Sequence, residues 1–209
     1  MSDTLSYQDF CRMCQAAAAQ IRANHEMLSR LDAAVGDGDH GTTILRAMEA
    51  MAKTVTENTG TDLKELLTKI GWDIMNSDGG STGPLLGSFF MGMSATVADK
   101  TDLDCTDVVA MLEGGINKVA KQSRAQIGDK TMMDAFLPAL DALHAAALSG
   151  SVRTALQQAA QAAATGADAT RSMRAKFGRA RNLGDRVIGH VDPGAVSVSL
   201  IFKGFSEAL

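Results

Sequence analysis

The sequence predicts an all-α protein, a single-domain bundle of about eight antiparallel helices. Aromatic residues make up only 4% of the 209 residues and prolines number three, whereas 45% are hydrophobic and alanine, leucine and methionine are abundant. This composition favours helices over sandwiches or barrels of short strands. Apolar residues recur every three to four positions, and short breaks rich in glycine and aspartate separate the periodic segments. Because no repeat or low-complexity linker interrupts this pattern, we expect residues 1–209 to form one domain.

Capping signals mark where the first and the last helix begin. Ser6 precedes Asp9 by three residues, the spacing of a capping box. Asp192 provides an N-cap and Pro193 a first-turn proline for the last helix. Residues 196–202 also alternate as a short strand would, so that alternative stays open.

Apolar stripes at three-to-four spacing support the helices in between. Phe10, Met13, Ala17 and Ile21 line the first helix, and Leu63, Leu66, Leu67, Ile70 and Ile74 line the third. Pro84 suits the first turn ahead of the fourth helix. The expected helices before the last one span residues 6–31, 43–55, 62–75, 85–97, 104–119, 131–148 and 151–176.

Charge and cysteine content exclude several classes of function. Twenty basic and 24 acidic side chains give a net charge of −4, so no protein-wide positive field attracts a nucleic acid or an anionic membrane. No leader and no run of 18 apolar residues is visible. Cys11, Cys14 and Cys105 are odd in number and lack a second pair for zinc. We therefore expect a cytoplasmic protein with core or partly buried thiols, and with neither nucleic acid nor membrane as a partner.

The first unusual break places Asp32, Asp37 and Asp39 within eight residues. Three carboxylates in a tight loop repel one another and call for a cation, and hard oxygen ligands favour magnesium or calcium. Counting from Asp37, the twelfth position is Met48 rather than the glutamate of an EF-hand, so magnesium is preferred. Magnesium commonly shares its ligands with phosphate. The alternative is a solvated turn in which Asp39 or His40 caps the next helix.

The second break, residues 76–84, is rich in glycine and hydroxyl groups and opens a helix. Free backbone N–H groups at a helix start bind anions, and Ser81 and Thr82 could add hydroxyl donors. No Walker A sequence is present, because Gly128 to Thr131 has the wrong residue order. A flexible connection between helices remains the alternative.

The third break, residues 171–194, is strongly basic in an otherwise acidic protein. It could neutralise a polyphosphate or dock an acidic partner, although a solvated helix face is the alternative. His40 and His190 lie in these breaks and are candidates for ligand contact, whereas His25 and His144 fall in helical patterns and are expected to be structural or exposed. The six bases before the final turn are Arg171, Arg174, Lys176, Arg179, Arg181 and Arg186.

Four motifs in these breaks resemble one family closely. They are LDAAVGDGDHGTT over residues 31–43, GGSTGPLLG over 79–87, GDKTM over 128–132 and GHVDPGA over 189–195. In this order they resemble the nucleotide-binding L subunit of bacterial dihydroxyacetone kinase and the equivalent C-terminal domain of single-chain dihydroxyacetone kinases. The resemblance spans nearly the whole chain.

The resemblance implies a barrel of eight antiparallel helices with ADP or ATP at one end. By the same resemblance, two Mg²⁺ ions join the phosphates to Asp32, Asp37 and Asp39, and no protein side chain acts as a nucleophile. Near Ser123 the chain departs from the family, because Gln122-Ser-Arg124 stands where members often have Arg-Gly-Lys. The implied nucleotide contacts are His40, Gly41, Thr42, Thr43, Ser81, Thr82, Ser123, Met132, Arg179, Asp192, Pro193 and Gly194.

The resemblance also implies the activity and the partners. Phosphate passes from Mg-bound ATP to dihydroxyacetone on a separate K subunit, and an M-type phosphohistidine protein of the phosphotransferase system rephosphorylates the bound ADP. Three aspartates and two Mg²⁺ sum to about +1, a charge that can accept a diphosphate or triphosphate. Alternatives are an L subunit that exchanges free ATP and acts on another short ketose such as erythrulose, and an ADP-bound regulator of a transcription factor. The expected assembly is a homodimer or a complex with the K subunit.

Overall fold

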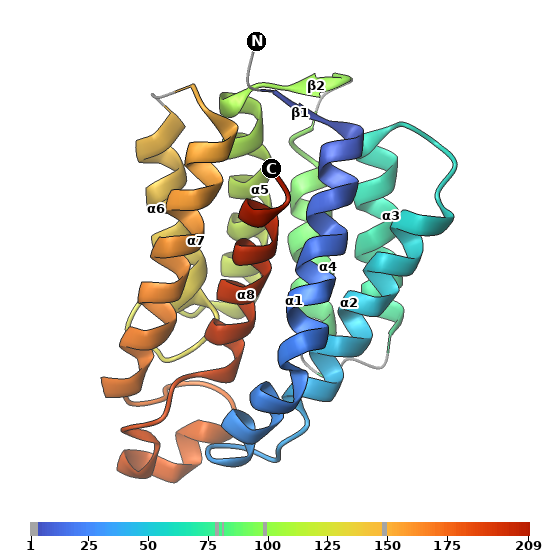
Figure 1. Cartoon of the computed structure of the whole chain (residues 1–209). Helices are drawn as coiled ribbons and strands as arrows, with labels where there is room; N and C mark the ends of the chain where they lie inside the picture. The colour runs from blue at the N-terminus through green and yellow to red at the C-terminus, as the bar shows by residue number, and fades with distance from the viewer. Residues whose placement is uncertain (1–3, 78–79, 81, 98–99, 148–149) are drawn as a thin grey trace.

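Eight α-helices run alternately in opposite directions and close into a barrel (Figure 1). The computed structural model describes residues 4–77, 80, 82–97, 100–147 and 150–209. Each helix packs against its neighbours in sequence, and α8 packs against α1, which closes the ring. The all-α prediction is therefore confirmed. The helices are α1 (Tyr7–Ala33), α2 (His40–Glu57), α3 (Leu63–Asn76), α4 (Thr82–Ser94), α5 (Cys105–Ser123), α6 (Met133–Ala147), α7 (Val152–Ala169) and α8 (Pro193–Glu207).

Both predicted capping signals are present. Ser6 and Asp9 form the reciprocal hydrogen bonds of a capping box at the start of α1. The Asp192 carboxylate accepts a hydrogen bond from the Ala195 N–H at 2.7 Å, and Pro193 occupies the first turn of α8. Helix α8 runs through residues 196–202, so the strand alternative for that stretch is wrong. Its buried residues follow a helical repeat, because α8 presents one face to the barrel interior.

Several helix boundaries differ from the sequence prediction. Helix α2 begins at His40, three residues early, and α4 covers Thr82–Ser94 rather than 85–97. Helix α7 ends at Ala169 rather than near 176, and two 3-10 segments follow, η1 (Thr170–Ser172) and η2 (Arg179–Val187). The Thr170 hydroxyl donates to the Ala167 carbonyl at 2.6 Å and accepts from the Asp192 N–H, so this turn is held by a residue far along the chain. Periodicity within one helix carries no signal of such a contact.

Two short strands were not anticipated. Leu5–Ser6 (β1) pairs antiparallel with Asp102–Leu103 (β2) near the end of the barrel that carries the N-terminus (Figure 1). Their two-residue length gives no alternating pattern in the sequence. Cys14 and Cys105 are buried and Cys11 is half-buried, as free thiols, which confirms that part of the prediction. Within the described segments, no helix is long and apolar enough to cross a membrane.

The barrel interior is filled with apolar side chains. Phe136 lies 5.1 Å from Phe89 and 6.2 Å from Phe202, between ring centroids, and all three are at most 2% exposed. Aromatic contacts at these separations stabilise a core beyond the area they bury. Because the interior is packed, polar chemistry is confined to the ends of the barrel.

The alternating helix directions place four helix N-termini at one end, the lower end in Figure 1. Helices α2, α4, α6 and α8 begin there. We call this the cavity end, because the segments that precede these four helices line the large cavity of the molecule. The positive ends of four helix dipoles therefore lie together, and such an arrangement attracts anions.

Gly41 lets α2 approach α1 closely, and its replacement is expected to destabilise the barrel. A Cβ atom at this position would lie 1.9 Å from the His25 carbonyl oxygen, which is backbone of α1. We expect Gly41→Ala to lower the free energy of unfolding by about 1–3 kcal/mol, because the helices must move apart. Urea denaturation measures the change. Gly60→Ala is the matched control, since the nearest atom to a Cβ there is a side-chain nitrogen 3.6 Å away. Equal stability of the two variants would contradict the prediction.

Candidate functional site

A cavity of about 600 Å³ opens at the cavity end of the barrel. This volume lies in the range of cofactor and small-ligand sites. Residues from the α1–α2, α3–α4, α5–α6 and α7–α8 connections line it, so segments far apart in the sequence meet there. The sequence-predicted residues that it brings together are Asp32, Asp37, Asp39, His40, Thr43, Thr82, Ser123, Met132, Arg179, Asp192, Pro193 and Gly194.

Two of the described residues among the predicted nucleotide contacts do not line the cavity. Gly41 is buried against α1, and Thr42 is exposed on α2. Ser81 lies outside the described residues. Gly41 is required by helix packing whether or not its backbone contacts a ligand.

The three aspartates of the first break converge. One carboxylate oxygen from each of Asp32, Asp37 and Asp39 lies within 4.8 Å of the others. The Asp32 carboxylate accepts a hydrogen bond from the His40 N–H at 3.2 Å, at the start of α2. Asp39 occupies the N-cap position of α2 but its side chain makes no capping hydrogen bond, and His40 is the first residue of the helix. The capping part of the alternative is therefore not supported, whereas Asp37 and Asp39 are exposed, as expected of a solvated turn.

A tight loop holds the carboxylates together. Gly38 has φ +82°, a left-handed conformation that glycine adopts without strain. A Cβ atom on Gly36 would lie 2.5 Å from an Asp32 carboxylate oxygen, so the loop leaves no room for a side chain there. Because carboxylate oxygens at this separation repel, the donor set fits a hard divalent cation such as Mg²⁺.

Arg179 reaches the acidic cluster from the α7–α8 connection. Its guanidinium group forms an ion pair with Asp37 across 142 positions of sequence. Both side chains remain accessible, with 69% and 41% exposed. An exposed ion pair contributes little to stability. Arg179 is therefore free to exchange a carboxylate partner for a phosphate oxygen.

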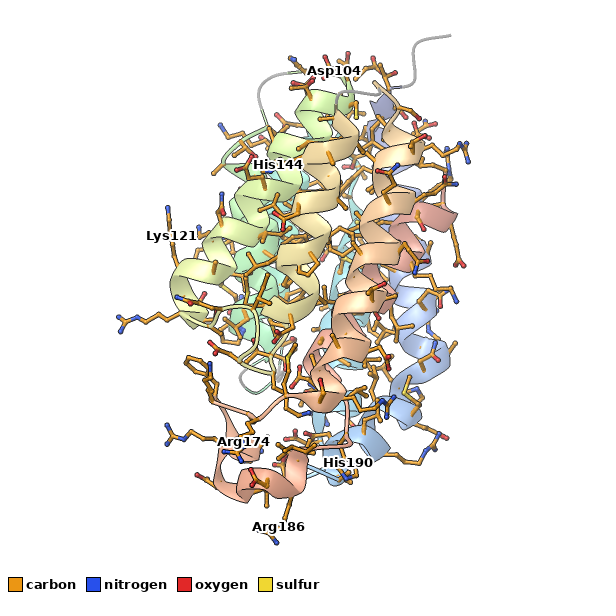
Figure 2. The ribbon with its side chains drawn as sticks, turned by 90° about the vertical axis from the view of Figure 1, so that its left-hand side faces the viewer. Asp104, Lys121, His144, Arg174, Arg186 and His190 are labelled. Atoms are coloured by element: carbon orange, nitrogen blue, oxygen red, sulfur yellow. The ribbon has the colours of Figure 1, made fainter. Side chains whose placement is uncertain are left out.

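The rest of the basic segment does not converge on the cavity. Arg174 pairs with Asp185 at 2.7 Å within the same connection. Arg174 and Arg186 extend from the lower end of the molecule, and His190 also lies there (Figure 2). His190 is exposed and outside the cavity lining, so its predicted ligand contact is not supported. His144, by contrast, is exposed beside Glu113 on the barrel wall, as predicted.

His40 is held in a defined orientation by a residue that sequence analysis missed. The Ser197 hydroxyl donates to the Pro193 carbonyl at 3.0 Å, so it accepts from His40 Nε2 at 2.7 Å. This assignment leaves His40 Nδ1 unprotonated toward Thr82 Oγ1, 3.5 Å away. Burial lowers the pKa of His40, while the charges of the nearby aspartates oppose the shift. His40 is accordingly a neutral ring at pH 7.

Asp192 forms part of the cavity wall beside the start of α8. The pKa of Asp192 is raised to about 7, mainly by desolvation and also by the negative charges of Asp134 and Asp32, against the hydrogen bond from Ala195 and the charge of Lys130. Near neutral pH, Asp192 is thus only partly charged. The wall that it forms repels an incoming anion less than an ordinary aspartate would.

Lys130 and Thr131 line the cavity but were not among the predicted contacts. Lys130 is 2% exposed and has φ +60°, which is unusual for a residue with a side chain. Its position inside the Gly128-Asp-Lys-Thr motif was the available signal. Phe177 also lines the cavity from the α7–α8 connection, and it is 39% exposed.

The fold and the site define a class, an all-α closed barrel with an acidic cluster at one end. The model of the DAK2 domain matches residues 34–207. The chain is 36% identical, over 90% of its length and 89% of the relative's, to the ADP-binding subunit DhaL of PEP-dependent dihydroxyacetone kinase 1 from Listeria innocua. It is 34% identical, over 85% of each chain, to the corresponding subunit of Escherichia coli. The chain belongs to the DAK2 domain family.

A solved structure extends this finding to three dimensions. The dihydroxyacetone kinase from C. freundii, in complex with AMP-PNP and Mg²⁺, superposes with a TM-score of 0.74 at 29% identity. The match covers 95% of this chain and 33% of that one. The chain likewise matches 34% of the length of L-erythrulose 1-kinase from Mycolicibacterium smegmatis, at 34% identity. These relatives are kinases or kinase subunits, and this chain shares their class of phosphotransferase.

Proposed function

We propose that the whole chain, residues 1–209, is the ADP- and ATP-binding domain of a dihydroxyacetone kinase, acting as a subunit beside a ketone-binding K subunit. The observation that carries the proposal is the convergence of Asp32, Asp37 and Asp39 at a 600 Å³ cavity where four helix N-termini meet. The relatives that it matches over nearly their full length are named ADP-binding subunits. Helix α1 precedes the matched DAK2 region but packs against α2 and α8, so it belongs to the same unit.

Charge balance supports the ligand. Two Mg²⁺ ions on the three aspartates would bring the cluster to about +1, whereas a single ion would leave it negative against a polyphosphate. Bound magnesium would neutralise charge on the bridging and terminal phosphate oxygens during transfer. We therefore propose two ions.

The chain's own residues have three tasks in this proposal. Backbone N–H groups at the start of α2, His40 to Thr43, would bind phosphate oxygens, with Ser81 and Thr82 adding hydroxyl donors. Met132 would pack on the base, and Ser123 with residues 192–194 would complete the wall around it. Arg179 would stabilise charge on the transferred phosphoryl group. Positioning and charge compensation suffice for phosphoryl transfer, so no protein nucleophile is required.

Calorimetry of the isolated chain tests the nucleotide site. We expect ADP and AMP-PNP to bind in the presence of Mg²⁺, and EDTA to weaken binding by about two orders of magnitude, because phosphate would then face uncompensated carboxylates. Titration with Mn²⁺ in place of Mg²⁺, followed by electron paramagnetic resonance, counts the ions per nucleotide. Equal affinity with and without divalent metal would exclude the proposed site, and a count of one would exclude the two-ion form.

Reconstitution tests the donor and the acceptor. We propose that ADP stays bound and is rephosphorylated by an M-type phosphohistidine protein. The relatives are named ADP-binding subunits of PEP-dependent kinases, which supports a phosphoryl donor other than free ATP. The chain, mixed with a K subunit and dihydroxyacetone, should then turn over with that donor and retain ADP through dialysis. Rapid turnover with free ATP would favour the form that exchanges ADP for ATP. Turnover with erythrulose in place of dihydroxyacetone tests the substrate suggested by the erythrulose kinases.

Sedimentation of the chain with and without the K subunit distinguishes a complex with that subunit from a homodimer. Retained ADP without any transfer would instead favour an ADP-bound regulatory partner of a transcription factor.

A further inference from the structure

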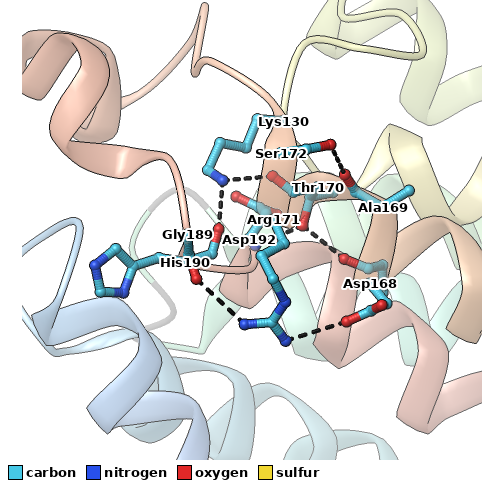
Figure 3. Close-up of polar contacts among 10 residues, drawn as sticks. Lys130, Asp168, Ala169, Thr170, Arg171, Ser172, Gly189, His190 and Asp192 are labelled. Carbon is cyan, nitrogen blue, oxygen red and sulfur yellow. Dashed lines mark hydrogen bonds and ion pairs between the residues drawn. The ribbon is translucent and has the colours of Figure 1, made fainter.

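The α7–α8 connection, residues 170–192, is a long excursion whose two ends come together. The Asp192 N–H donates to Thr170 Oγ1 at 2.8 Å, and the Gly189 N–H donates to the Arg171 carbonyl at 2.8 Å. The Arg171 guanidinium returns a hydrogen bond to the Gly189 carbonyl at 3.2 Å. We call the place where these ends meet the neck of the loop (Figure 3).

Lys130 joins both sides of this neck from a different connection. Its ammonium group donates to the Thr170 carbonyl at 2.5 Å and to the His190 carbonyl, 40 and 60 positions away in sequence (Figure 3). Lys130 is 2% exposed and Thr170 is fully buried. Hydrogen bonds from a buried charged donor are stronger than neutral ones, and buried carbonyls that lose their donor are costly. Lys130 thus connects the two ends of the loop from outside the loop, through charge-assisted hydrogen bonds to both of them.

The backbone of Lys130 supports the same conclusion. Its φ of +60° places a side-chain-bearing residue in the left-handed region, which costs free energy that the surroundings must offset. Glycine would adopt this conformation without that cost. Lysine at this position offsets the cost because, unlike glycine, it supplies an ammonium group that binds the Thr170 and His190 carbonyls of the neck.

Beyond the neck, the loop is attached to the rest of the molecule mainly by polar contacts. Lys176 binds Asp129 through its side chain at 2.6 Å and through its backbone N–H at 3.1 Å. Arg179 pairs with Asp37. Val187 is the one fully buried side chain among the described residues of 173–188. The Arg179–Asp37 pair is exposed and adds little, whereas Asp129 is buried, so the neck and the contact between Lys176 and Asp129 together hold the loop closed.

The loop forms one wall of the cavity. Phe177, Gly178, Arg179 and Ala180 line it, and Arg179 contacts the acidic cluster. Gly178 and Gly184 have φ of +63° and +58°, so the loop bends at residues that tolerate such angles. A ligand in the cavity would be enclosed by this loop, and its release would require the loop to move.

We propose that Lys130 is a positioning residue that keeps the neck of the 170–192 loop closed and thereby sets how long a nucleotide stays in the cavity. The proposal rests on the function proposed above, because it takes the nucleotide as the enclosed ligand. Lys130 acts through the loop and need not touch the nucleotide itself. Its removal takes the ammonium donor from the His190 carbonyl and leaves the Thr170 carbonyl with the Met173 N–H alone, so the loop opens more often.

Lys130→Met tests this role, since methionine keeps much of the side-chain length and removes the donor. In stopped-flow displacement of a fluorescent ADP analogue, we expect dissociation about 10- to 100-fold faster than in the unmodified chain, as expected for losing two charge-assisted hydrogen bonds. Lys203→Met is the matched control, because Lys203 is 54% exposed on α8 and makes only a 3.8 Å contact with Glu207. An unchanged dissociation rate in Lys130→Met would overturn the proposal.

Limited tryptic digestion of the nucleotide-free protein separates a loop effect from a general loss of stability. The loop carries six tryptic sites, of which five lie beyond the neck: Arg174, Lys176, Arg179, Arg181 and Arg186. We expect Lys130→Met to accelerate cleavage at these sites selectively, with cleavage at Lys121 and Arg124 unchanged. Equal acceleration of cleavage at all sites would show that Lys130 contributes only to the general stability of the protein, and would overturn the proposal.

A second variant opens the neck from its other side. Thr170→Val removes the hydroxyl that accepts from the Asp192 N–H and leaves Lys130 in place. We expect the same two changes as for Lys130→Met, smaller in size because both hydrogen bonds of the lost hydroxyl, to Asp192 and to Ala167, are between neutral groups. If Lys130→Met fails to fold, Thr170→Val tests the proposal instead. A rate of tryptic cleavage in the loop equal to that of the unmodified chain would then overturn it. If the unmodified chain binds no nucleotide, the proposed function fails, whereas the digestion still tests the neck.

Discussion

Asp37→Asn is expected to reduce phosphoryl transfer by about a hundredfold to a thousandfold, the effect of removing one preorganised electrostatic contact in an active site. The substitution keeps the shape of the side chain and removes one of three charges that lie within 4.8 Å of one another. Fewer carboxylates bind Mg²⁺ more weakly, so the phosphate charge in the transition state is less well compensated. Turnover in the reconstituted system and Mn²⁺ affinity of the isolated chain measure the two consequences.

Asp141→Asn is the control for this substitution. Asp141 is exposed on α6, away from the cavity lining. The thermal stability of Asp37→Asn should not fall, because its partner Arg179 is largely exposed and the substitution relieves repulsion within the cluster. Full activity in Asp37→Asn would refute the assignment of Asp37 as a metal ligand.

Arg179→Met is expected to lower the turnover rate by about a hundredfold to a thousandfold while leaving the fold intact. Arginines that contact a transferred phosphoryl group contribute at least this much in other phosphotransferases. Of the six basic residues of this segment, Arg179 is the one that lines the cavity in the described structure. Its ion pair with Asp37 shows that it reaches the acidic cluster. The turnover rate at saturating donor, compared with the affinity for ADP, shows whether the loss lies in transfer or in binding.

Arg181→Met provides the matched control two residues further along the same loop. Arg181 is exposed and does not line the cavity. Both variants remove one positive charge from the same segment, so a general change in the electrostatic potential of the loop would lower turnover equally in both. Equal turnover in Arg179→Met and Arg181→Met would exclude a specific role for Arg179.

Most helices of the barrel could be predicted from the sequence, because the pattern of buried apolar residues in each helix is visible in its own sequence. Apolar residues at three-to-four spacing identify a helix without any knowledge of its neighbours. Ser6 with Asp9, and Asp192 with Pro193, marked helix starts correctly since capping is local. The ends of α2 and α7 were misplaced because other segments decide them. Thr170, which follows α7, is bound to Asp192, and His40, which begins α2, binds Asp32 and Ser197.

The acidic cluster could also be predicted from the sequence, since three aspartates in one short loop cannot lie far apart. Lys130 and Ser197 could not. Lys130 lies 40 and 60 residues from the carbonyls that it binds, and Ser197 lies 157 residues from His40. Ser197 has no local pattern that distinguishes it from an ordinary helical serine, and the Gly128-Asp-Lys-Thr motif around Lys130 does not show which carbonyls this lysine binds.

By itself, the sequence determined the helices, their order and the identity of the acidic loop, because those properties depend on contacts between residues close in the chain. Only the tertiary structure decided that four connections and four helix N-termini meet at one cavity, that Arg179 alone of the basic segment lines it, and that Lys130 closes the neck of the loop above it. The physical reason is the closure of the ring. Once α8 packs against α1, groups separated by more than a hundred residues come within hydrogen-bonding distance.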